Sequence, residues 1–293
     1  MPSLGDVVLL GASGFVGRAI QDELTRCGQH VVGLSSSTCD LRTPHGLAHL
    51  RQLVGQDTIL IMAAAITRDR SDSVEACEAN IAMAADVAKL VRDHPIRKCL
   101  YVSSDAVYGD HRTNRAMTEE TPPDPQTLYA AAKLTGELLI REAAKASATP
   151  VVLVRPCRIY GPGDPHLTYG PARFIKTALD AQTIELFGDG EERRDFLYIE
   201  DAARLICRLA VNDATGVYNV ASGHQVSFAQ VAEQIGRLLG GSVRVVSHPR
   251  THPVVHLGLS LAKLRQAVAD VPLTPLAEGV RKALEAACEV AHA

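Results

Sequence analysis

The sequence predicts an α/β protein built on a doubly wound parallel sheet, and three observations support this fold class. Short, almost wholly apolar runs alternate with helical patterns along the first half of the 293-residue chain. A glycine-rich turn joins the first apolar run to the first helical pattern, and later runs end in small or hydroxylated residues. Runs of this kind are typical of parallel strands that are buried on both faces, and their alternation with helices indicates right-handed crossovers.

The first strand, at 6–10, and the first helix, at 18–27, flank the glycine turn. Gly11 permits the tight turn, Gly14 lets the backbone approach a diphosphate, and Gly17 lets helix and strand pack closely. The helix N-terminus presents free N–H groups to the same anion. The turn therefore predicts a dinucleotide site of the Rossmann type, which Ser13, Phe15 and Val16 complete.

The second strand, at 30–34, bears on the choice of cofactor. The dinucleotide motif places an acidic residue at its end to hold the ribose of NAD. Three hydroxyl side chains stand there instead: Ser35, Ser36 and Ser37. They would tolerate a 2′-phosphate, for which Arg18 is a candidate cation, so the sequence leans toward NADP and leaves NAD open. Asp40, followed by Leu41, is a candidate partner for the adenine amino group.

The rest of this half follows the same alternation. We expect a helix at 45–54, a strand at 58–65, a helix at 73–94, a strand at 98–103 and a helix at 128–146. Small side chains at the end of the third strand would leave room for a cofactor: Ala63, Ala64 and Ala65. Ligands of such sheets bind at the carboxyl ends of the strands. The glycine turn, these alanines and Ser104 all fall at that edge.

Tyr129 and Lys133 lie four residues apart near the start of the helix at 128–146, and therefore on one helical face. A tyrosine ordinarily keeps its proton until about pH 10. A fixed positive charge nearby favours the phenolate and lets the side chain act as a base near neutral pH. A lone Tyr-x-x-x-Lys arises often by chance, so the interpretation depends on the other motifs.

These other motifs follow one another in a fixed order. They are Gly11-x-x-Gly14-x-x-Gly17, residues 104–109, Tyr129-x-x-x-Lys133, residues 155–164, residues 187–190, residues 194–196 and residues 199–201. In this order the chain resembles the extended short-chain dehydrogenase/reductase family, of the NAD-dependent epimerase/dehydratase type that acts on nucleotide sugars.

The resemblance implies roles for particular residues. Ser104 would hydrogen-bond the reacting oxygen of a sugar alcohol or ketone, and Tyr129 would exchange a proton with that oxygen. Lys133 would lower the pKa of the tyrosine and hold the nicotinamide ribose. Arg194 would contact a substrate phosphate, for which a guanidinium is suited; the alternative is an arginine paired with a neighbouring glutamate.

Two positions depart from the family pattern. Dehydratases of the family carry an Asp-Glu pair after the catalytic residue, whereas here Asp105 is followed by Ala106, which disfavours dehydration. Asp105 either tunes Ser104, contacts the substrate or faces water. Arg158 stands where many members have an asparagine on the nucleotide diphosphate. It either binds that phosphate more strongly or indicates an unusual substrate.

The resemblance also implies a smaller substrate lobe interleaved with the sheet. We expect a dinucleotide-binding domain at 1–156, with later returns near 195–222, and a substrate-binding lobe mainly at 157–293. Helices at 172–181, 197–211 and 227–239 and a strand at 217–220 are expected in this half. His166 and His224 could lie near the lobe, and we assign neither a role.

Composition excludes several other classes of function. Thirty Lys and Arg against 33 Asp and Glu give a net charge of −3, which offers no general attraction to nucleic acid or to anionic membranes. The longest apolar run is too short to span a bilayer. Seven scattered cysteines, with no spacing typical of a zinc site, indicate reduced thiols in a cytoplasmic protein and no bound metal.

The sequence thus predicts a cytoplasmic enzyme that epimerises or reduces a nucleotide-linked sugar with NADP or NAD. By resemblance, the two long helices at 73–94 and 128–146 would pair with their copies in a homodimer. One alternative is a reductase or dehydrogenase of a non-nucleotide carbonyl compound. The other is a non-catalytic protein that senses a dinucleotide.

Overall fold

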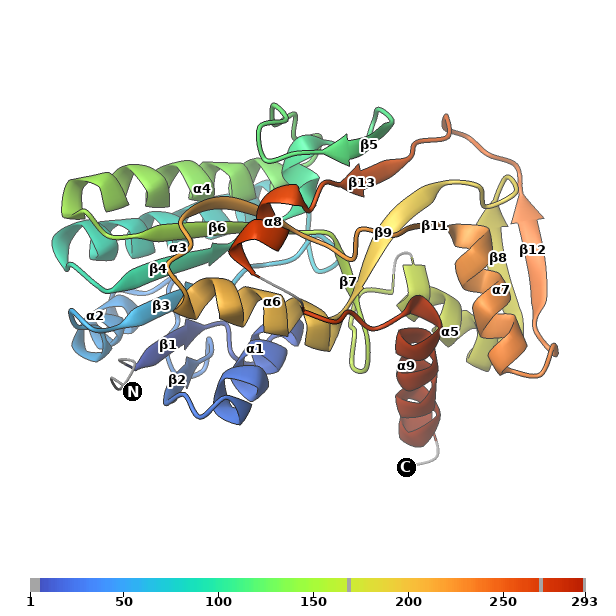
Figure 1. Ribbon diagram of the computed structural model, residues 1–293, viewed down its shortest axis with the longest axis horizontal. Coiled ribbons are helices and arrows are strands. Elements are labelled where there is room, and N and C mark those ends of the chain that lie inside the picture. The colour runs from blue at the N-terminus through green and yellow to red at the C-terminus, as the bar shows by residue number, and fades with distance from the viewer. Residues whose placement is uncertain (1–5, 168–169, 269–270, 292–293) are drawn as a thin grey trace.

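A parallel sheet forms the centre of the larger part of the molecule in the computed structural model, which describes residues 6–167, 170–268 and 271–291 (Figure 1). Within these residues the sheet has six strands in the order β2-β1-β3-β4-β6-β10. The strands are β1 (Val7–Leu10), β2 (Val31–Leu34), β3 (Ile59–Met62), β4 (Lys98–Val102), β6 (Val151–Pro156) and β10 (Gly216–Val220). Every pair is parallel, which confirms the predicted fold class.

Helices cover both faces of this sheet (Figure 1). One face packs against α1 (Phe15–Arg26) and α6 (Ile199–Val211), and the other against α2 (Pro44–Leu53), α3 (Val74–Asp93) and α4 (Leu128–Ser147). Successive strand residues point to opposite faces. In β1, Val7 and Leu9 join the core beside α1 and α6, while Val8 and Leu10 join the core beside α3 and α4. Both faces of β1 are therefore buried, which explains why every residue of this strand is apolar.

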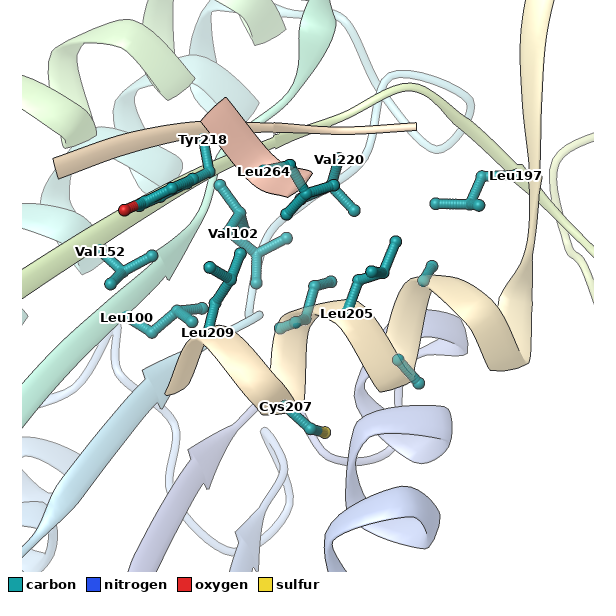
Figure 2. Close-up of a cluster of buried hydrophobic side chains, with 14 of the residues drawn as sticks. Leu100, Val102, Val152, Leu197, Leu205, Cys207, Leu209, Tyr218, Val220 and Leu264 are labelled. Atoms are coloured by element: carbon teal, nitrogen blue, oxygen red, sulfur yellow. The ribbon is translucent and has the colours of Figure 1, made fainter. Parts of the chain in front are cut away.

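Figure 2 shows the core between the sheet and α6. Leu205 and Leu209 of α6 belong to the same buried cluster as residues of β4, β6 and β10. The labelled sheet residues are Leu100, Val102, Val152, Tyr218 and Val220, and Leu264 of α8 (Ala262–Ala267) lies beside them. Each fully buried aliphatic side chain of this kind contributes about 1.5–3 kcal/mol. The cluster therefore anchors the late segments of the chain to the sheet.

The smaller lobe has a core of its own at the carboxyl edge of the sheet (Figure 1). Its elements are α5 (Gly170–Ala181), β8 (Thr183–Phe187), α7 (Phe228–Leu238), β12 (Arg244–His248) and α9 (Leu276–Ala291). A three-stranded sheet of β7 (Arg158–Tyr160), β9 (Arg193–Tyr198) and β11 (Gln225–Ser227) leads into it, and β5 (Asn114–Met117) pairs with β13 (Leu257–Leu259). Tyr160 makes edge contacts with Phe196 and Tyr198.

Some boundaries differ from those predicted. The third strand ends at Met62 rather than at residue 65, because Ala63 to Ala65 leave the sheet and line a cavity. The helix expected at 197–211 begins at Ile199, since Leu197 and Tyr198 pair with β7 as the end of β9. Residues 168–169 of the predicted lobe lie outside the described residues. The expected return strand is present as β10, at the edge of the main sheet beside β6.

Candidate active site

The glycine turn has the geometry that its sequence predicts. Gly11 has a φ of +85°, and a Cβ there would lie 2.6 Å from the backbone nitrogen of Ala64. A Cβ on Gly17 would lie 2.0 Å from the carbonyl oxygen of Gly11, so the helix packs directly on the turn. Gly14 is the N-cap of α1 and supplies no side-chain cap. The N–H groups of this helix N-terminus are therefore available to an anion.

A cavity of about 230 Å³ opens beside this turn at the ends of β1, β2 and β3. Most of the predicted cofactor residues line it: Gly11, Ser13, Gly14, Ser35, Ser36, Asp40, Leu41, Ala63, Ala64 and Ala65. Gly17 does not, because it packs helix against strand. The shape of the turn and the small residues at its far wall fit the adenosine half of a dinucleotide.

The charged groups of this cavity were not all predicted. Arg42 donates to both carboxylate oxygens of Asp40 at 2.8 Å, and these bonds lower the pKa of Asp40 to about 2. Arg42 and Arg70 line the cavity. Arg18, the cation that the sequence suggested, instead donates to the carbonyl oxygen of Ser13 and lines a separate cleft between α1 and α6.

A second cavity, of about 180 Å³, adjoins the first through Ala63 and Ala65, which line both. It brings together residues that lie far apart in the sequence. Those predicted to act on cofactor or substrate are Phe15, Val16, Ser104, Asp105, Tyr129, Lys133 and Arg158. The three predicted catalytic residues therefore share one cavity next to the dinucleotide turn.

Tyr129 enters this cavity from the first turn of α4. Thr127 caps the helix by accepting a hydrogen bond from the backbone N–H of Ala130 at 3.1 Å. The backbone N–H of Tyr129 donates to the carboxylate of Asp72 at 2.9 Å. Two side chains thus fix the start of the helix that carries the phenol.

Lys133 lies one helical turn further along and is buried, with 3% of its surface exposed. Its ammonium donates to the carbonyl oxygen of Val102 at 2.7 Å and lies 5.8 Å from the centre of the Tyr129 ring. Burial lowers the pKa of Lys133 to about 8, and the carboxylate of Glu137 acts in the opposite direction. A positive charge beside Tyr129 is what the predicted proton chemistry requires.

Ser104 follows β4 and begins a short 3-10 helix, η1 (Asp105–Tyr108). Its hydroxyl oxygen accepts from the backbone N–H of Ala106 at 3.1 Å and lies 3.4 Å from a carboxylate oxygen of Asp105. The other oxygen of Asp105 lies 3.5 Å from the guanidinium of Arg158. Burial raises the pKa of Asp105, while Arg158 and Arg194 lower it. Arg158, which replaces the asparagine of the family pattern, thus forms an ion pair with Asp105 inside the cavity.

Arg194 is buried and is not among the residues that line this cavity. Its guanidinium donates to the carbonyl oxygens of Val255 and Arg193, and it lies 3.7 Å from Glu192. Burial and the nearby Arg158 lower the pKa of Arg194 to about 10. Its Nε atom is buried and makes no hydrogen bond in the described part of the chain.

Arg250 is a second cation beside Glu192, and the sequence analysis did not predict it. It lies 3.3 Å from one carboxylate oxygen of Glu192, whereas Arg194 approaches the other. The Nε atom of Arg250 is likewise buried without a hydrogen bond among the described residues. Residue 250 lies 56 positions after residue 194 in the chain, so no local pattern could have joined the two. Glu192 holds two guanidinium groups close together.

His166 links the two halves of the molecule, although the sequence suggested no role for it. Its Nδ1 atom lies 2.7 Å from Asp164 in its own loop, and its Nε2 atom lies 3.2 Å from Asp69, in the loop after β3. Its ring contacts the edge of Phe15. Asp164 and Asp69 raise the pKa of His166. We call these three residues the His166 clasp; all three line the cavity of Tyr129.

Among residues 6–167, 170–268 and 271–291, no cluster of three or more His, Cys, Asp or Glu side chains is arranged to hold a metal ion. All seven cysteines fall within these ranges and are free. In the same part of the chain, no helix has both the length and the apolar character needed to cross a bilayer.

Comparison with known proteins adds independent information. The sequence profile of the family described as NAD dependent epimerase/dehydratase matches residues 7–221. UDP-glucose 4-epimerase of Mycolicibacterium smegmatis is 27% identical over 95% of this chain and 97% of its own length. The low-salt glycan biosynthesis protein Agl12 of Haloferax volcanii is 33% identical, but the match spans only 51% of this chain and 48% of that protein.

Solved structures agree on the fold. UDP-glucose 4-epimerase of Thermotoga maritima, solved with UDP-glucose, superposes with a TM-score of 0.86 over 98% of this chain and 100% of its own, at 20% identity. UDP-glucose 4-epimerase of Thermus thermophilus, solved with NAD, gives a TM-score of 0.82 over 96% of this chain and 98% of its own, at 22% identity.

Proposed function

Since this chain belongs to the NAD-dependent epimerase/dehydratase family, we propose that it epimerises or reduces a sugar carbon of a nucleotide-linked sugar. The observation that carries the proposal is the single cavity lined by Ser104, Tyr129 and Lys133, which adjoins the dinucleotide cavity at Ala63 and Ala65. Proton handling and cofactor binding then meet at one place. Ala106 stands where a dehydratase would carry its glutamate, which supports epimerisation or reduction over dehydration.

The residues present fit a nicotinamide dinucleotide. Gly11 and Gly14 leave space at an uncapped helix N-terminus where any side chain would collide or intrude. When bound, the nicotinamide would supply the hydride acceptor and donor. Ser104 would hydrogen-bond the reacting sugar oxygen, and Tyr129 would take a proton from it or return one. The charge on Lys133 would favour the phenolate during this exchange.

The phosphate groups of the substrate would bind Arg194 and Arg250. Support for this comes from two neighbouring guanidinium groups whose buried Nε atoms lack hydrogen bonds within the described chain. Both approach Glu192, and Arg250 also pairs with Glu191 at 2.9 Å. Guanidinium groups bind phosphate oxygens in pairs of parallel hydrogen bonds. Arg158 would lie nearer the sugar, because it lines the cavity of Tyr129.

Replacing Tyr129 with phenylalanine tests the mechanism. We expect turnover of UDP-glucose or dTDP-glucose to fall by at least about 100-fold, the usual contribution of a general acid–base group. Binding of the dinucleotide should stay within a few fold of wild type, as measured by calorimetry. Full turnover in a correctly folded Tyr129→Phe variant would refute the proposed mechanism.

For the cofactor, we propose that NADP is accepted in addition to NAD. The serines at the end of β2 and the presence of Arg42 in the adenosine cavity support tolerance of a 2′-phosphate. The family description and the NAD in the Thermus thermophilus structure concern NAD alone. Calorimetric titration with NAD, NADH, NADP and NADPH would measure which of these cofactors the protein binds. Failure to bind NADPH would limit the enzyme to NAD.

We also propose a homodimer formed through α3 and α4. These helices pack against each other, and Val74 and Leu138 on them are large apolar side chains that are 57% and 45% exposed. A change of Leu138 to lysine should then favour monomers, which sedimentation velocity at micromolar concentration would detect. A wild-type monomer under the same conditions would contradict the proposal.

Two further proposals concern the organisation and location of the protein. We propose that the chain divides near residue 156 into a dinucleotide-binding domain and a substrate lobe, which the separate core of the lobe supports. The elements α6 and β10 return to the main sheet after that point. We propose a cytoplasmic location, which the seven free cysteines support.

A further inference from the structure

Below the catalytic pair, α4 carries a third polar residue on the same face. Tyr129, Lys133 and Glu137 follow one another at intervals of four residues and therefore line one side of the helix. Glu137 is only 3% exposed. A buried carboxylate is costly unless other groups compensate its charge, so its surroundings need an explanation.

Two residues hold this carboxylate in place. Arg155 of β6 binds it with two hydrogen bonds, from Nε at 2.9 Å and from Nη2 at 2.6 Å. The hydroxyl of Ser103 donates to the same carboxylate at 2.5 Å. Ser103 is the residue directly before Ser104, and Arg155 in turn lies over the ring of Tyr108 at 4.8 Å. The carboxylate thus joins α4 to the ends of β4 and β6.

The side chains around Lys133 identify the carboxylate of Glu137 as its negatively charged neighbour. Tyr101 of β4 places its ring 5.0 Å from the ammonium, but burial raises the pKa of its phenol, which therefore stays neutral. The Tyr129 ring lies 5.8 Å away. Of the other charged residues that line the cavity, Asp105 pairs with Arg158, while Asp69 and Asp164 pair with His166. Arg68 pairs with Asp110 outside the cavity.

We propose that Glu137 is a positioning residue for the catalytic pair: its carboxylate, fixed by Arg155 and Ser103, keeps the buried ammonium of Lys133 charged and directed at Tyr129. The inference rests on the proposed function for its catalytic meaning. Burial alone lowers the pKa of Lys133, and the carboxylate one turn away opposes that effect. The carboxylate of Glu137 would thus set the highest pH at which Lys133 is still positively charged beside Tyr129.

The test is a direct titration of Lys133 by NMR. The chain has seven lysines, so protein labelled with ¹³C at the lysine ε-carbon gives few signals, and the Lys133→Met variant assigns the relevant one. In Glu137→Gln we expect the midpoint of the Lys133 titration to fall by about one pH unit or more, the usual effect of removing an opposite charge at close range. Glu137→Asp keeps the charge and should restore part of the shift.

Lys98 is a matched internal control. It is also buried, its pKa is also lowered to about 8 by burial, and it donates to the carbonyl oxygens of Leu209 and Asn212 at the end of α6, away from Glu137. Its midpoint should not change in Glu137→Gln. A fall at both lysines would indicate a general loosening of the fold and would overturn the proposal.

A second variant covers the case in which Glu137→Gln fails to fold, because that change leaves the Arg155 charge buried and uncompensated. Glu137→Gln combined with Arg155→Gln removes both charges, and the Lys133 midpoint should fall by less than in Glu137→Gln alone, because loss of the positive charge of Arg155 acts in the opposite direction. An unchanged midpoint in the folded variants would overturn the inference. The titration needs neither substrate nor cofactor. A failure of the proposed function would therefore show as an inactive wild type with the shift intact, and is distinguishable from a failure of this inference.

Discussion

At the scale of single residues, the candidate site contains buried charged side chains that would assist proton transfer. Lys133 is the central case, because its ammonium is enclosed beside Tyr129 and its pKa is lowered to about 8. A lysine at the surface would keep its charge throughout the neutral and mildly alkaline range. Enclosure brings the charge close to the phenol and makes that charge sensitive to pH.

The pH dependence of turnover follows from this pKa. Lys133 is charged below about pH 8 and loses its proton as the pH rises through that value. Turnover that needs the cation should therefore decline on the alkaline side with a midpoint near pH 8. Steady-state rates with UDP-glucose between pH 6 and 10 would measure the decline.

Lys133→Arg is the informative control, since an arginine stays charged up to a pKa above about 12. Residual activity in that variant should lose its alkaline decline near pH 8. If the decline persists unchanged, another group causes it.

At the scale of elements, loops at the carboxyl edge of the sheet need support from the helices behind them. The loop after β3 lines both cavities and is held by Asn80, a buried residue of α3. Its side-chain amide accepts from the backbone N–H of Ile66 at 2.8 Å and donates to the backbone carbonyl of the same residue at 2.9 Å. One side chain thus satisfies both backbone polar groups of a residue in the loop that lines the two cavities.

Asn80→Ala should both destabilise the protein and weaken dinucleotide binding. Two hydrogen bonds to the backbone are lost, and a buried polar group left unpaired costs about 1–3 kcal/mol. Thermal unfolding would measure the first effect and calorimetric titration with NADH the second. Asn114→Ala, at an exposed position of β5, is the control and should change neither. Unaltered NADH affinity in a destabilised Asn80→Ala would show that the loop keeps its conformation without the amide.

At the scale of the whole molecule, two halves with separate cores must meet around one cavity. The His166 clasp crosses that boundary, from the loop after β7 to Asp69 in the loop after β3. Both ring nitrogens of His166 face carboxylates, and Asp164 is the larger cause of its raised pKa. The charged imidazolium is therefore the form that holds the two loops together.

The clasp predicts a pH-dependent stability. A histidine whose pKa is raised on folding contributes stability that is fully present below its unfolded pKa, about 6.5, and is lost as the pH rises through the folded value. The difference in melting temperature between wild type and His166→Gln should thus be largest near pH 6 and shrink toward pH 8. His224→Gln, at an exposed position, should show no such trend. A difference that is constant with pH would mean that the charge of His166 does not matter.

Local patterns were sufficient for most of the fold and for the common helical face of the two proposed catalytic residues of α4. Hydrophobic periodicity and glycine spacing act over a few residues, so they predicted the strand, turn and helix around Gly11, and they placed Tyr129 and Lys133 on one helical face. Boundaries were less well predicted. Tyr198 belongs to a strand rather than to the following helix because it pairs with Tyr160, which is 38 positions earlier.

The sequence alone therefore determined the sheet, the glycine turn and the order of the family motifs, because each depends on residues close together in the chain. Only the tertiary structure decided how buried charges are compensated. Asp105 meets Arg158, Glu137 meets Arg155, and Asp69 meets His166 across long stretches of sequence. Such pairs form because folding removes charged groups from water and each then requires a partner. No spacing along the chain specifies which partner that will be.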